Sequence, residues 1–413
     1  MSADCYEFTL NSTTGRLTAA DVLEGFDKLW RRERPSEALT KVEVVVPSRG
    51  ANLHPDALCA LARCLLRAQS EGLSVQFSGD LRNGNRLANY LSRTNLFGIL
   101  GLQPSGLPLP ELDRIGLHLP IRRIHDHDDV FEAVNRLVEM LLHQAECSPG
   151  ILDGFEWSIN EVIDNILVHA ESPLGGIVIG QTVKHPPCVR VAIGDFGRGI
   201  KASLSERFDD LRMERDAILH ATTPGVTRDP DIGQGNGLAG TRQIVEENEG
   251  TLVVTSNDWT VQMGSGAPKS WVEWSFPGTQ VVITLRTDRS LDLTKTLVGE
   301  VTVPYIENSY ENDAGERVIV VKDHISSCGN RPAGRIMRNL LKNVSGPDGQ
   351  AVALDFSGVR SVSSSFADEF IGKYAKQIGR DVFLSRHRII VERDLHRAVL
   401  NKALHTRGGE KAE

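Results

Sequence analysis

The most regular pattern in the chain is a helical repeat of apolar residues in FEWSINEVIDNILVHA, Phe155–Ala170. Residues three and four positions apart lie on one face of an α-helix, so this spacing predicts an amphipathic helix. Glu161, Asn165 and His169 recur every four residues and line up along another side of it. A carboxylate one turn from a carboxamide can orient or deprotonate a nucleophile and offer Mg²⁺ a neutral oxygen ligand, although a solvated polar face has the same pattern. The apolar face comprises Ile159, Val162, Ile163 and Ile166.

Residues 1–120 show strand patterns that alternate with helix patterns. The apolar run VEVVV is typical of a buried strand, and an amphipathic helical run follows it. Strands separated by helices of this length predict a mainly parallel sheet. The Pro- and Gly-rich segment Gly101–Pro110 indicates a loop or a domain boundary. The predicted elements are strands Val42–Val46 and Leu73–Phe77 and helices Pro55–Gln69 and Asn83–Leu96.

The charged segment HDHDD, His125–Asp129, precedes another predicted helix, Phe131–Ala145. Histidines and aspartates this close together suggest a metal cluster, but a charged helix start is the simpler interpretation. Asp128 or Asp129 would cap the helix, and their negative charges suit the positive end of the helix dipole.

A predicted strand, Val189–Ile193, runs directly into the glycine-rich turn Gly194–Gly199. Asp195 stands at the strand end, and Gly197 and Gly199 allow a tight turn because they lack a Cβ atom. A carboxylate held in this way can accept a hydrogen bond from an exocyclic amine, which distinguishes adenine from guanine. A plain glycine turn is the alternative interpretation.

A second glycine-rich segment, GQGNGL at Gly233–Leu238, opens a predicted helix that runs through Glu247. Backbone N–H groups and the dipole at such a helix start make an anion site. The polar stretch before it, Ala202–Asp231, is long enough to act as a mobile lid and includes a short predicted helix, Met213–Ala221. A dinucleotide-binding fingerprint is excluded, because the preceding residues PGVTRDPDIGQ cannot form the buried strand that it requires.

Composition narrows the function classes. The 413 residues carry a formal net charge of −8, which argues against a general nucleic-acid binder. No apolar tract is long enough to cross a bilayer, and the first residues, MSADCYEFTL, lack the features of a signal peptide. The six cysteines are scattered without a CxxC pair, which favours reduced thiols and argues against structural zinc. We therefore expect a cytoplasmic protein that does not associate with membranes.

Three motifs occur in an order that is typical of a known group of ATPases. They are E-x-x-x-N-x-x-x-H-A at Glu161–Ala170, D-x-G-x-G at Asp195–Gly199 and G-x-G-x-G-L at Gly233–Leu238. Residues 130–286 thereby resemble the GHKL ATPases, which include gyrase, heat-shock protein 90, histidine kinases, MutL and the anti-sigma-factor serine kinases. The resemblance implies a Bergerat-type α/β sandwich that binds ATP between helices and a lid.

The same resemblance implies roles for single residues. Glu161 would be the general base, Asn165 the Mg²⁺ ligand and Asp195 the residue that binds the adenine amino group. Gly197 and Gly199 would shape the adenine pocket. Because the chain has this glutamate and lacks an H-E-x-x-x-P phosphoacceptor helix, it is more similar to the serine-kinase and gyrase-like branches than to sensor histidine kinases. The lid hinge and the phosphate contacts would involve Gly233, Gly235, Gly237 and Leu238.

The C-terminal region again alternates strand and helix patterns, and it contains a serine cluster before the predicted helix Phe366–Gln377. Serine is a favoured residue at a helix start, so simple capping is one interpretation. The segment also resembles the STAS-like fold of anti-anti-sigma factors, and more closely a STAS-like domain often fused to GHKL ATPases. In those factors a D-S-S-G motif carries the phosphorylated serine, which corresponds by position to Ser365 or Ser364. The other predicted elements here are strands Val318–Val321 and Ala351–Phe356 and helix Ala333–Lys342.

Together these patterns predict an α+β multidomain protein in which a Bergerat-type α/β sandwich ATPase is flanked by STAS-like α/β domains. We interpret the N-terminal domain as a degenerate STAS-like relative. The expected domains are 1–120 (N-terminal α/β), 121–290 (ATP-binding), 291–316 (connector) and 317–413 (C-terminal STAS-like).

The expected function is that of a regulatory protein that binds ATP and Mg²⁺ and phosphorylates a serine of a STAS-like domain, in the same chain or in a partner. Two alternatives stay open: a conformational ATPase with slow hydrolysis, and a nucleotide-sensing adaptor without turnover. The expected partners are ATP and a STAS-type or other regulatory protein. Nucleic acid is not expected, and the resemblance is compatible with a homodimer.

Overall fold

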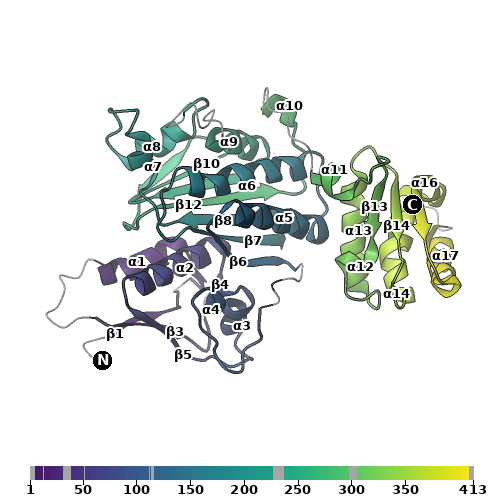
Figure 1. Ribbon diagram of the computed structural model, residues 1–413, viewed down its shortest axis with the longest axis horizontal. Helices are drawn as coiled ribbons and strands as arrows, with labels where there is room; N and C mark the ends of the chain where they lie inside the picture. The colour runs from purple at the N-terminus through teal and green to yellow at the C-terminus, as the bar shows by residue number, and fades with distance from the viewer. Residues whose placement is uncertain are drawn as a thin grey trace. The chain divides into compact units, whose positions relative to one another are not determined.

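The computed structural model describes residues 5–12, 14–30, 39–50, 52–110, 112, 116–226, 237–296 and 305–408. The chain divides into two compact units, each built from helices and strands (Figure 1). The first unit comprises Met1–Leu137, Gly154–Arg286 and Leu293–Leu297, and the second Val138–Asp153, Thr287–Asp292 and Val298–Glu413.

The first unit begins with a small parallel sheet. Its strands follow the order β1-β3-β5, and both neighbouring pairs are parallel, as the alternation of strands and helices predicts. The sequence pattern predicts neither β1 nor the helix α1 that follows it. The elements are β1 (Cys5–Thr9), β2 (Arg16–Leu17), α1 (Ala19–Trp30), β3 (Lys41–Val46), β4 (Asn52–Leu53), α2 (Pro55–Ser70), β5 (Ser74–Gly79), α3 (Arg86–Arg93) and α4 (Leu96–Ile99).

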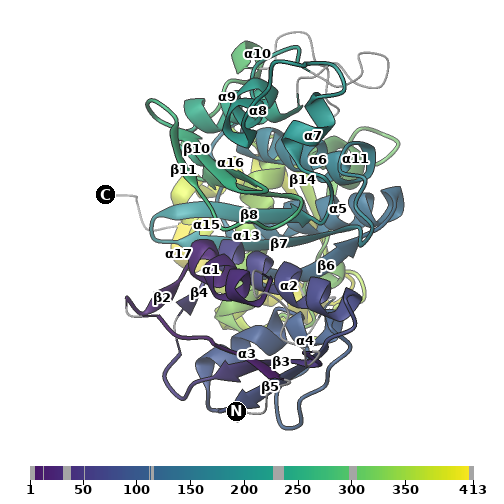
Figure 2. The same ribbon diagram turned by 90° about the vertical axis from the view of Figure 1, so that its left-hand side faces the viewer.

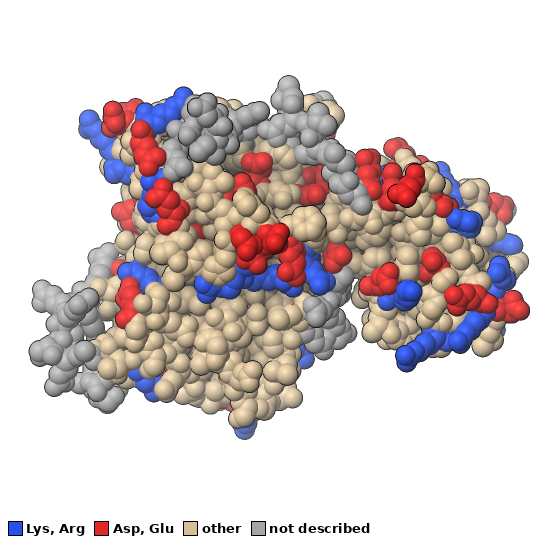
Figure 3. Space-filling view, viewed as in Figure 1, with Lys and Arg blue, Asp and Glu red and all other residues tan. Residues whose placement is uncertain are grey.

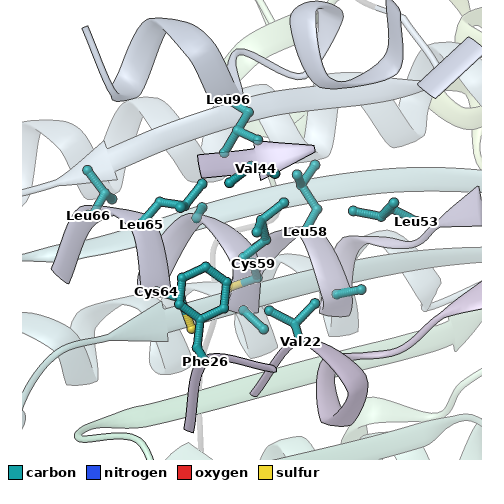
Figure 4. Close-up of a cluster of buried hydrophobic side chains, with 14 of the residues drawn as sticks. Val22, Phe26, Val44, Leu53, Leu58, Cys59, Cys64, Leu65, Leu66 and Leu96 are labelled. Atoms are coloured by element: carbon teal, nitrogen blue, oxygen red, sulfur yellow. The ribbon is translucent and has the colours of Figure 1, made fainter. Parts of the chain in front are cut away.

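Helix α2 lies in the middle of this unit and is buried along almost its whole length. It contacts β5 of the small sheet as well as β7 and β8 of a larger sheet. In Figure 4, Leu58 and Leu65 of α2 lie toward Val44 of β3, and Cys59 and Cys64 of α2 lie beside Phe26 of α1. The same hydrophobic cluster continues to Ile177 of the larger sheet. A helix enclosed on several sides must be apolar around most of its circumference, which is why α2 contains so few charged residues.

A seven-stranded sheet forms the rest of the first unit. Its strand order is β11-β10-β9-β12-β8-β7-β6, and every neighbouring pair is antiparallel. In both ribbon views α1 and α2 lie on one face of this sheet and α6 and α9 on the other (Figures 1 and 2). The strands are β6 (His118–Ile124), β7 (Gly176–Lys184), β8 (Pro187–Asp195), β9 (Thr251–Ser256), β10 (Trp259–Gly264), β11 (Lys269–Val272) and β12 (Thr279–Arg286). The helices of this part are α6 (Ile151–Val168), α7 (Ile200–Leu204), α8 (Glu214–Ala221), α9 (Gly237–Glu247) and α10 (Leu293–Thr296).

Helix α5 (His127–Gln144) starts within the charged segment rather than after it. The Asp126 carboxylate accepts a hydrogen bond from the backbone N–H of Asp129 at 2.9 Å, and the Asp129 carboxylate accepts one from the N–H of His125 at 2.8 Å. A capping side chain has to precede the first helical residue, so Asp126 is the cap. The prediction of Asp128 or Asp129 as the cap is therefore wrong, although both still place negative charge in the first turn.

The second unit contains a three-stranded parallel sheet in the order β13-β14-β15. The predicted helix Phe366–Gln377 occurs as an uninterrupted helical run that begins at Ser364 and includes a π-helical turn, Asp368–Gly372. The strands are β13 (Arg317–Val320), β14 (Val352–Asp355) and β15 (His387–Ile390). The helices are α11 (Tyr305–Tyr310), α12 (Val321–His324), α13 (Arg331–Ser345), α14 (Ser364–Ala367), α15 (Lys373–Ile378), α16 (Arg380–Arg386) and α17 (Asp394–Gly408).

The last residues of α5 belong to the second unit, and the side chain of Asn343 of α13 binds the backbone at this end of the helix. Nδ2 of Asn343 donates to the carbonyl oxygens of Leu142 and Ala145, both at 2.9 Å, and Oδ1 accepts from the N–H of Cys147 at 3.0 Å. The last carbonyl groups of a helix have no partner within the helix, so a side chain from elsewhere has to satisfy them. One buried amide therefore binds three backbone groups at the end of α5.

Acidic and basic side chains are interspersed on the face of the molecule drawn in Figure 3. This face therefore shows both signs of charge. Among the described residues, no helix combines the length and the apolar character that crossing a membrane requires.

Candidate functional site

Helix α6 has the apolar face that its sequence predicts. Its four predicted core residues are at most 4 % exposed. Glu161 and Asn165 are half-buried on another side of the helix, one turn apart, and His169 follows the last helical residue. This side of α6 therefore presents a carboxylate and a carboxamide that the hydrophobic core does not bury. The four core residues are Ile159, Val162, Ile163 and Ile166.

The start of α9 lies against Glu161. A Cβ atom added to Gly237 would lie 2.5 Å from Oε2 of Glu161, so a larger residue here would displace the Glu161 carboxylate. Leu238 is half-buried in the first turn of α9. Gly233 and Gly235, and the end of the predicted lid, lie outside the described residues. Gly237 is therefore the one described glycine of this motif, and it lies at the acidic side of α6.

The turn after β8 packs against Ala170, two residues after the end of α6. The N–H of Arg198 donates to the carbonyl oxygen of Ala170 at 3.1 Å, and a Cβ atom on Gly197 would lie 2.0 Å from the same oxygen. Gly199 has φ +83°, and a Cβ atom there would lie 2.2 Å from Nδ2 of Asn257. Both glycines of this turn are thus required by close packing, and Gly199 also by its left-handed backbone.

Asp195 is the last residue of β8 and is 7 % exposed. Its Oδ1 atom accepts hydrogen bonds from the N–H of Gly197 at 2.8 Å and from the N–H of Thr279 at 3.1 Å. Among the described residues, no donor reaches Oδ2. Burial raises the pKa of the Asp195 carboxyl, while the positive charge of Arg63 and the two N–H groups lower it. A buried carboxylate with one oxygen fixed and one available is suited to accept a hydrogen bond from a ligand amine.

The sequence patterns do not single out two residues beside Asp195, Gly278 and Thr279. Gly278 has φ +94°, and a Cβ atom there would lie 2.7 Å from Oδ1 of Asp195, while Thr279 supplies one of the two N–H donors. The available signal is a Gly-Thr pair directly before the apolar run QVVITL. The sequence patterns do not single out Arg63 either. The feature that could have indicated it is an arginine in the middle of the apolar run LCALARCLL.

A second buried carboxylate, Glu214 of α8, has a structural role. It is 7 % exposed and accepts hydrogen bonds from the N–H of Lys201 at 3.1 Å and from Oγ of Ser256 at 3.0 Å. It also accepts one from Nδ2 of Asn257. These contacts hold α7 and α8 to the end of β9, and they leave Glu214 little capacity for a ligand.

In the second unit, Ser363 caps the helical run that follows it. Its Oγ atom accepts a hydrogen bond from the N–H of Phe366 at 3.1 Å and lies 3.1 Å from Oγ of Ser365. Ser364 is exposed and Ser365 half-buried. Capping thus accounts for Ser363 and does not require Ser364 or Ser365.

The groups around Glu161 and Asp195 fit magnesium and ATP in their chemistry. A carboxylate oxygen suits the adenine amine, a carboxamide oxygen suits a hard cation, and a helix start suits phosphate. The glycines supply backbone surfaces that a Cβ atom would obstruct. The contacts of Gly237 with Glu161 and of Gly197 with Ala170 bring segments that are remote in sequence to the second half of α6 and to the residues directly after it.

Comparison with known proteins bears on the C-terminal region. No curated protein matches the chain. Residues 333–392 extend from α13 past β15 and include the serine cluster. They match the model of a family described as a STAS-like domain of unknown function (DUF4325), so the C-terminal region contains a STAS-like domain, as its sequence predicts.

Proposed function

We propose that residues 121–290 bind Mg·ATP in a Bergerat-type sandwich and that the protein transfers the γ-phosphate to a serine of a STAS-like domain. The observation that carries this proposal is the contact of two separate glycine motifs with α6 and the residues directly after it. Gly237 lies against Glu161 of α6, and Gly197 lies against Ala170, two residues after the helix ends. The antiparallel sheet with α6 and α9 on one face supports the same proposal.

Each residue of the site has a distinct role in this proposal. Asp195 accepts a hydrogen bond from the adenine amino group, and the N–H groups at the start of α9 bind phosphate oxygens. Asn165 coordinates Mg²⁺, which neutralises phosphate charge. The acceptor hydroxyl oxygen forms a bond to the γ-phosphorus as the bond to the ADP oxygen breaks, and Glu161 takes the hydroxyl proton.

The acceptor in this proposal is Ser364 or Ser365, in the same chain or in a partner. Both lie in the first turn of a helical run, where a phosphate is stabilised by the positive end of the helix dipole. The exposure of Ser364 favours it on grounds of access.

One observation favours a second candidate function, a conformational ATPase in which water is the acceptor. The hydroxyl of Ser365, one of the two candidate acceptors, already lies at hydrogen-bond distance from the hydroxyl of Ser363. In that case the same residues bind ATP, and hydrolysis rearranges the flanking domains.

Incubation of the full chain with γ-labelled ATP and Mg²⁺ tests the reaction. We expect label on the protein, and we expect the double variant Ser364→Ala/Ser365→Ala to lose it while ATP affinity is unchanged. The control is Ser361→Ala, which changes an exposed serine just before the cluster. Release of free phosphate without labelling would support the conformational ATPase, and neither product would support an adaptor without turnover. Label that persists in the double variant would overturn the acceptor assignment.

Asp195→Asn is expected to weaken ATP binding by about 1.5–3 kcal/mol, because a charge-assisted hydrogen bond to the adenine amine is lost. The amide retains Oδ1 for its two backbone donors but presents an N–H₂ group where the carboxylate presented Oδ2. Calorimetric titration with ATP measures the effect. Asp210→Asn, which changes an exposed aspartate of the same unit, is the control. Parental affinity in Asp195→Asn would exclude Asp195 from the nucleotide site.

A further inference from the structure

An arginine of the N-terminal region lies directly behind Asp195. Arg63 is on α2 and is 2 % exposed. Its Nε atom donates to the carbonyl oxygen of Asp195 at 2.8 Å, and its Nη2 atom donates to that of Pro277 at 3.0 Å. The guanidinium carbon lies 4.6 Å from the ring centre of Phe276 and 5.9 Å from that of Phe196. A cation of the first 120 residues therefore contacts the end of β8 and the segments beside it that carry the candidate adenine site.

These two hydrogen bonds join the two segments that position the Asp195 carboxylate. One goes to Asp195 itself, and the other goes to Pro277, two residues before the Thr279 N–H that binds Oδ1. The planar fork of a guanidinium can donate to two acceptors at once in a fixed geometry, which the single ammonium of a lysine does not reproduce. Arg63 thus joins the end of β8 to the segment that precedes β12.

The packing around this arginine leaves little room for adjustment. A Cβ atom on Gly194 would lie 2.6 Å from Cδ of Arg63 and 3.0 Å from Sγ of Cys59. The helix α2 therefore approaches β8 so closely at this point that a side chain at position 194 would collide with Arg63. A buried cation is costly unless its surroundings compensate it, which makes an arginine here a poor choice for packing alone.

Arg63 also acts on Asp195 through its charge. Among the described residues, the titratable groups that face Asp195 are Arg63 and Cys59, both from α2. Burial raises the pKa of the Cys59 thiol to about 12, so this group is neutral at physiological pH. The other facing groups are the backbone donors of Gly197 and Thr279. Arg63 is thus the formal charge that favours the ionised carboxylate.

We propose that Arg63 is a positioning residue of the nucleotide site, which holds Asp195 and the segment beginning at Pro277 in the arrangement that selects adenine. The N-terminal α/β region is then a structural component of that site rather than an appended module. This inference rests on the proposed ATP binding. By linkage, a nucleotide that binds Asp195 also stabilises the contact between α2 and the large sheet.

Two substitutions separate the charge of Arg63 from its hydrogen bonds. Arg63→Met removes both, and Arg63→Lys keeps the charge but loses the fork. The matched control is Arg67→Met, one turn further along α2. Arg67 also lies over Phe276, at 5.4 Å, but its Nε atom pairs with Glu71 instead of the Asp195 segment. Each full-length variant is titrated with ATP and with GTP over a range of pH, and its melting temperature is recorded.

We expect Arg63→Met to weaken ATP binding about tenfold, a usual size for coupling between adjacent sites, and to reduce the preference for ATP over GTP. Binding requires ionised Asp195, so ATP affinity is retained above the pKa of this group and lost as the pH falls through it. Without Arg63 that pKa is higher, and the loss of affinity begins at higher pH. Arg63→Lys should weaken ATP binding several-fold yet keep the parental pH midpoint. Arg67→Met should match the parent in ATP affinity, ATP/GTP ratio and pH midpoint.

The outcomes separate this inference from the proposed function. If the parent binds neither nucleotide, both are overturned. If the parent binds ATP and Arg63→Met keeps the parental affinity, ATP/GTP ratio and pH midpoint, the role of Arg63 alone is overturned. Should Arg63→Met fail to fold, Arg63→Lys decides: weaker binding with the parental midpoint supports the positioning role, and parental affinity overturns it.

Discussion

Glu161→Ala is expected to reduce phosphate transfer from ATP by about 10²–10⁴-fold, the usual effect of removing a positioned general base, while ATP affinity changes little. In the proposed site Glu161 takes the proton of the acceptor hydroxyl, whereas Asp195 binds the adenine amino group. Loss of the carboxylate therefore affects the transition state more than the bound ground state. Single-turnover rates and equilibrium titrations of the same variant measure the two effects separately.

The close approach of Gly237 makes the choice of substitution important. Alanine leaves empty space beside the start of α9, whereas Glu161→Gln keeps the volume and removes only the charge. Asp164→Ala is the control on the same helix, since its side chain is 47 % exposed and lies 3.6 Å from Nδ1 of His127. Equal losses of turnover and affinity in both Glu161 variants would contradict the base assignment, because a damaged helix would produce the same result.

Local sequence patterns predict which segments of this protein form helices and strands better than they predict which of these elements contact one another. The apolar spacing of α6 and the strand–helix alternation around β3 and β5 are repeated features, and the structure has both. A predicted single helix, Asn83–Leu96, instead forms α3 and α4, because Asn95 adopts a left-handed backbone with φ +65°. No residue type requires that conformation, so the helix pattern could not reveal the break.

The antiparallel order of the large sheet is not available from local sequence. β8 pairs with β12, which is remote along the chain, and β6 pairs with β7 through an irregular register. Such pairing depends on the covering helices and on tertiary burial rather than on the pattern within a strand. β1 was missed because its alternation extends over only five residues.

The candidate site likewise has features that follow from the sequence and features that only the structure reveals. The spacing of Glu161 and Asn165 on one helix follows directly from the sequence, since both residues belong to one element. The contacts of Asp195 with Thr279 and Arg63 join segments that are far apart in the chain, so only the folded structure reveals them. The serine cluster was correctly placed at a helix start, but the identity of the cap, Ser363, depended on which hydroxyl met a backbone donor.

The largest expected effect on stability concerns Asn343. Asn343→Ala is expected to lower the free energy of unfolding of the second unit by about 3 kcal/mol, because two carbonyl groups and one N–H group at the end of α5 lose a buried partner. Asn339→Ala is the matched control one turn earlier on α13. It removes one hydrogen bond, of 3.2 Å, to the carbonyl of His143, and should cost about 1 kcal/mol.

The distribution of tryptophan makes this prediction specific to one unit. All five tryptophans lie within the first unit, so intrinsic tryptophan fluorescence follows its unfolding. Hydrogen exchange of peptides from α13 and β14 follows the second unit, which has none. We expect Asn343→Ala to accelerate exchange in α13 and β14 and to leave the fluorescence transition in urea near its parental midpoint. Exchange no faster than in Asn339→Ala would contradict the role of Asn343, because a side chain that satisfies three buried backbone groups cannot cost less than one that satisfies a single group. The tryptophans are Trp30, Trp157, Trp259, Trp271 and Trp274.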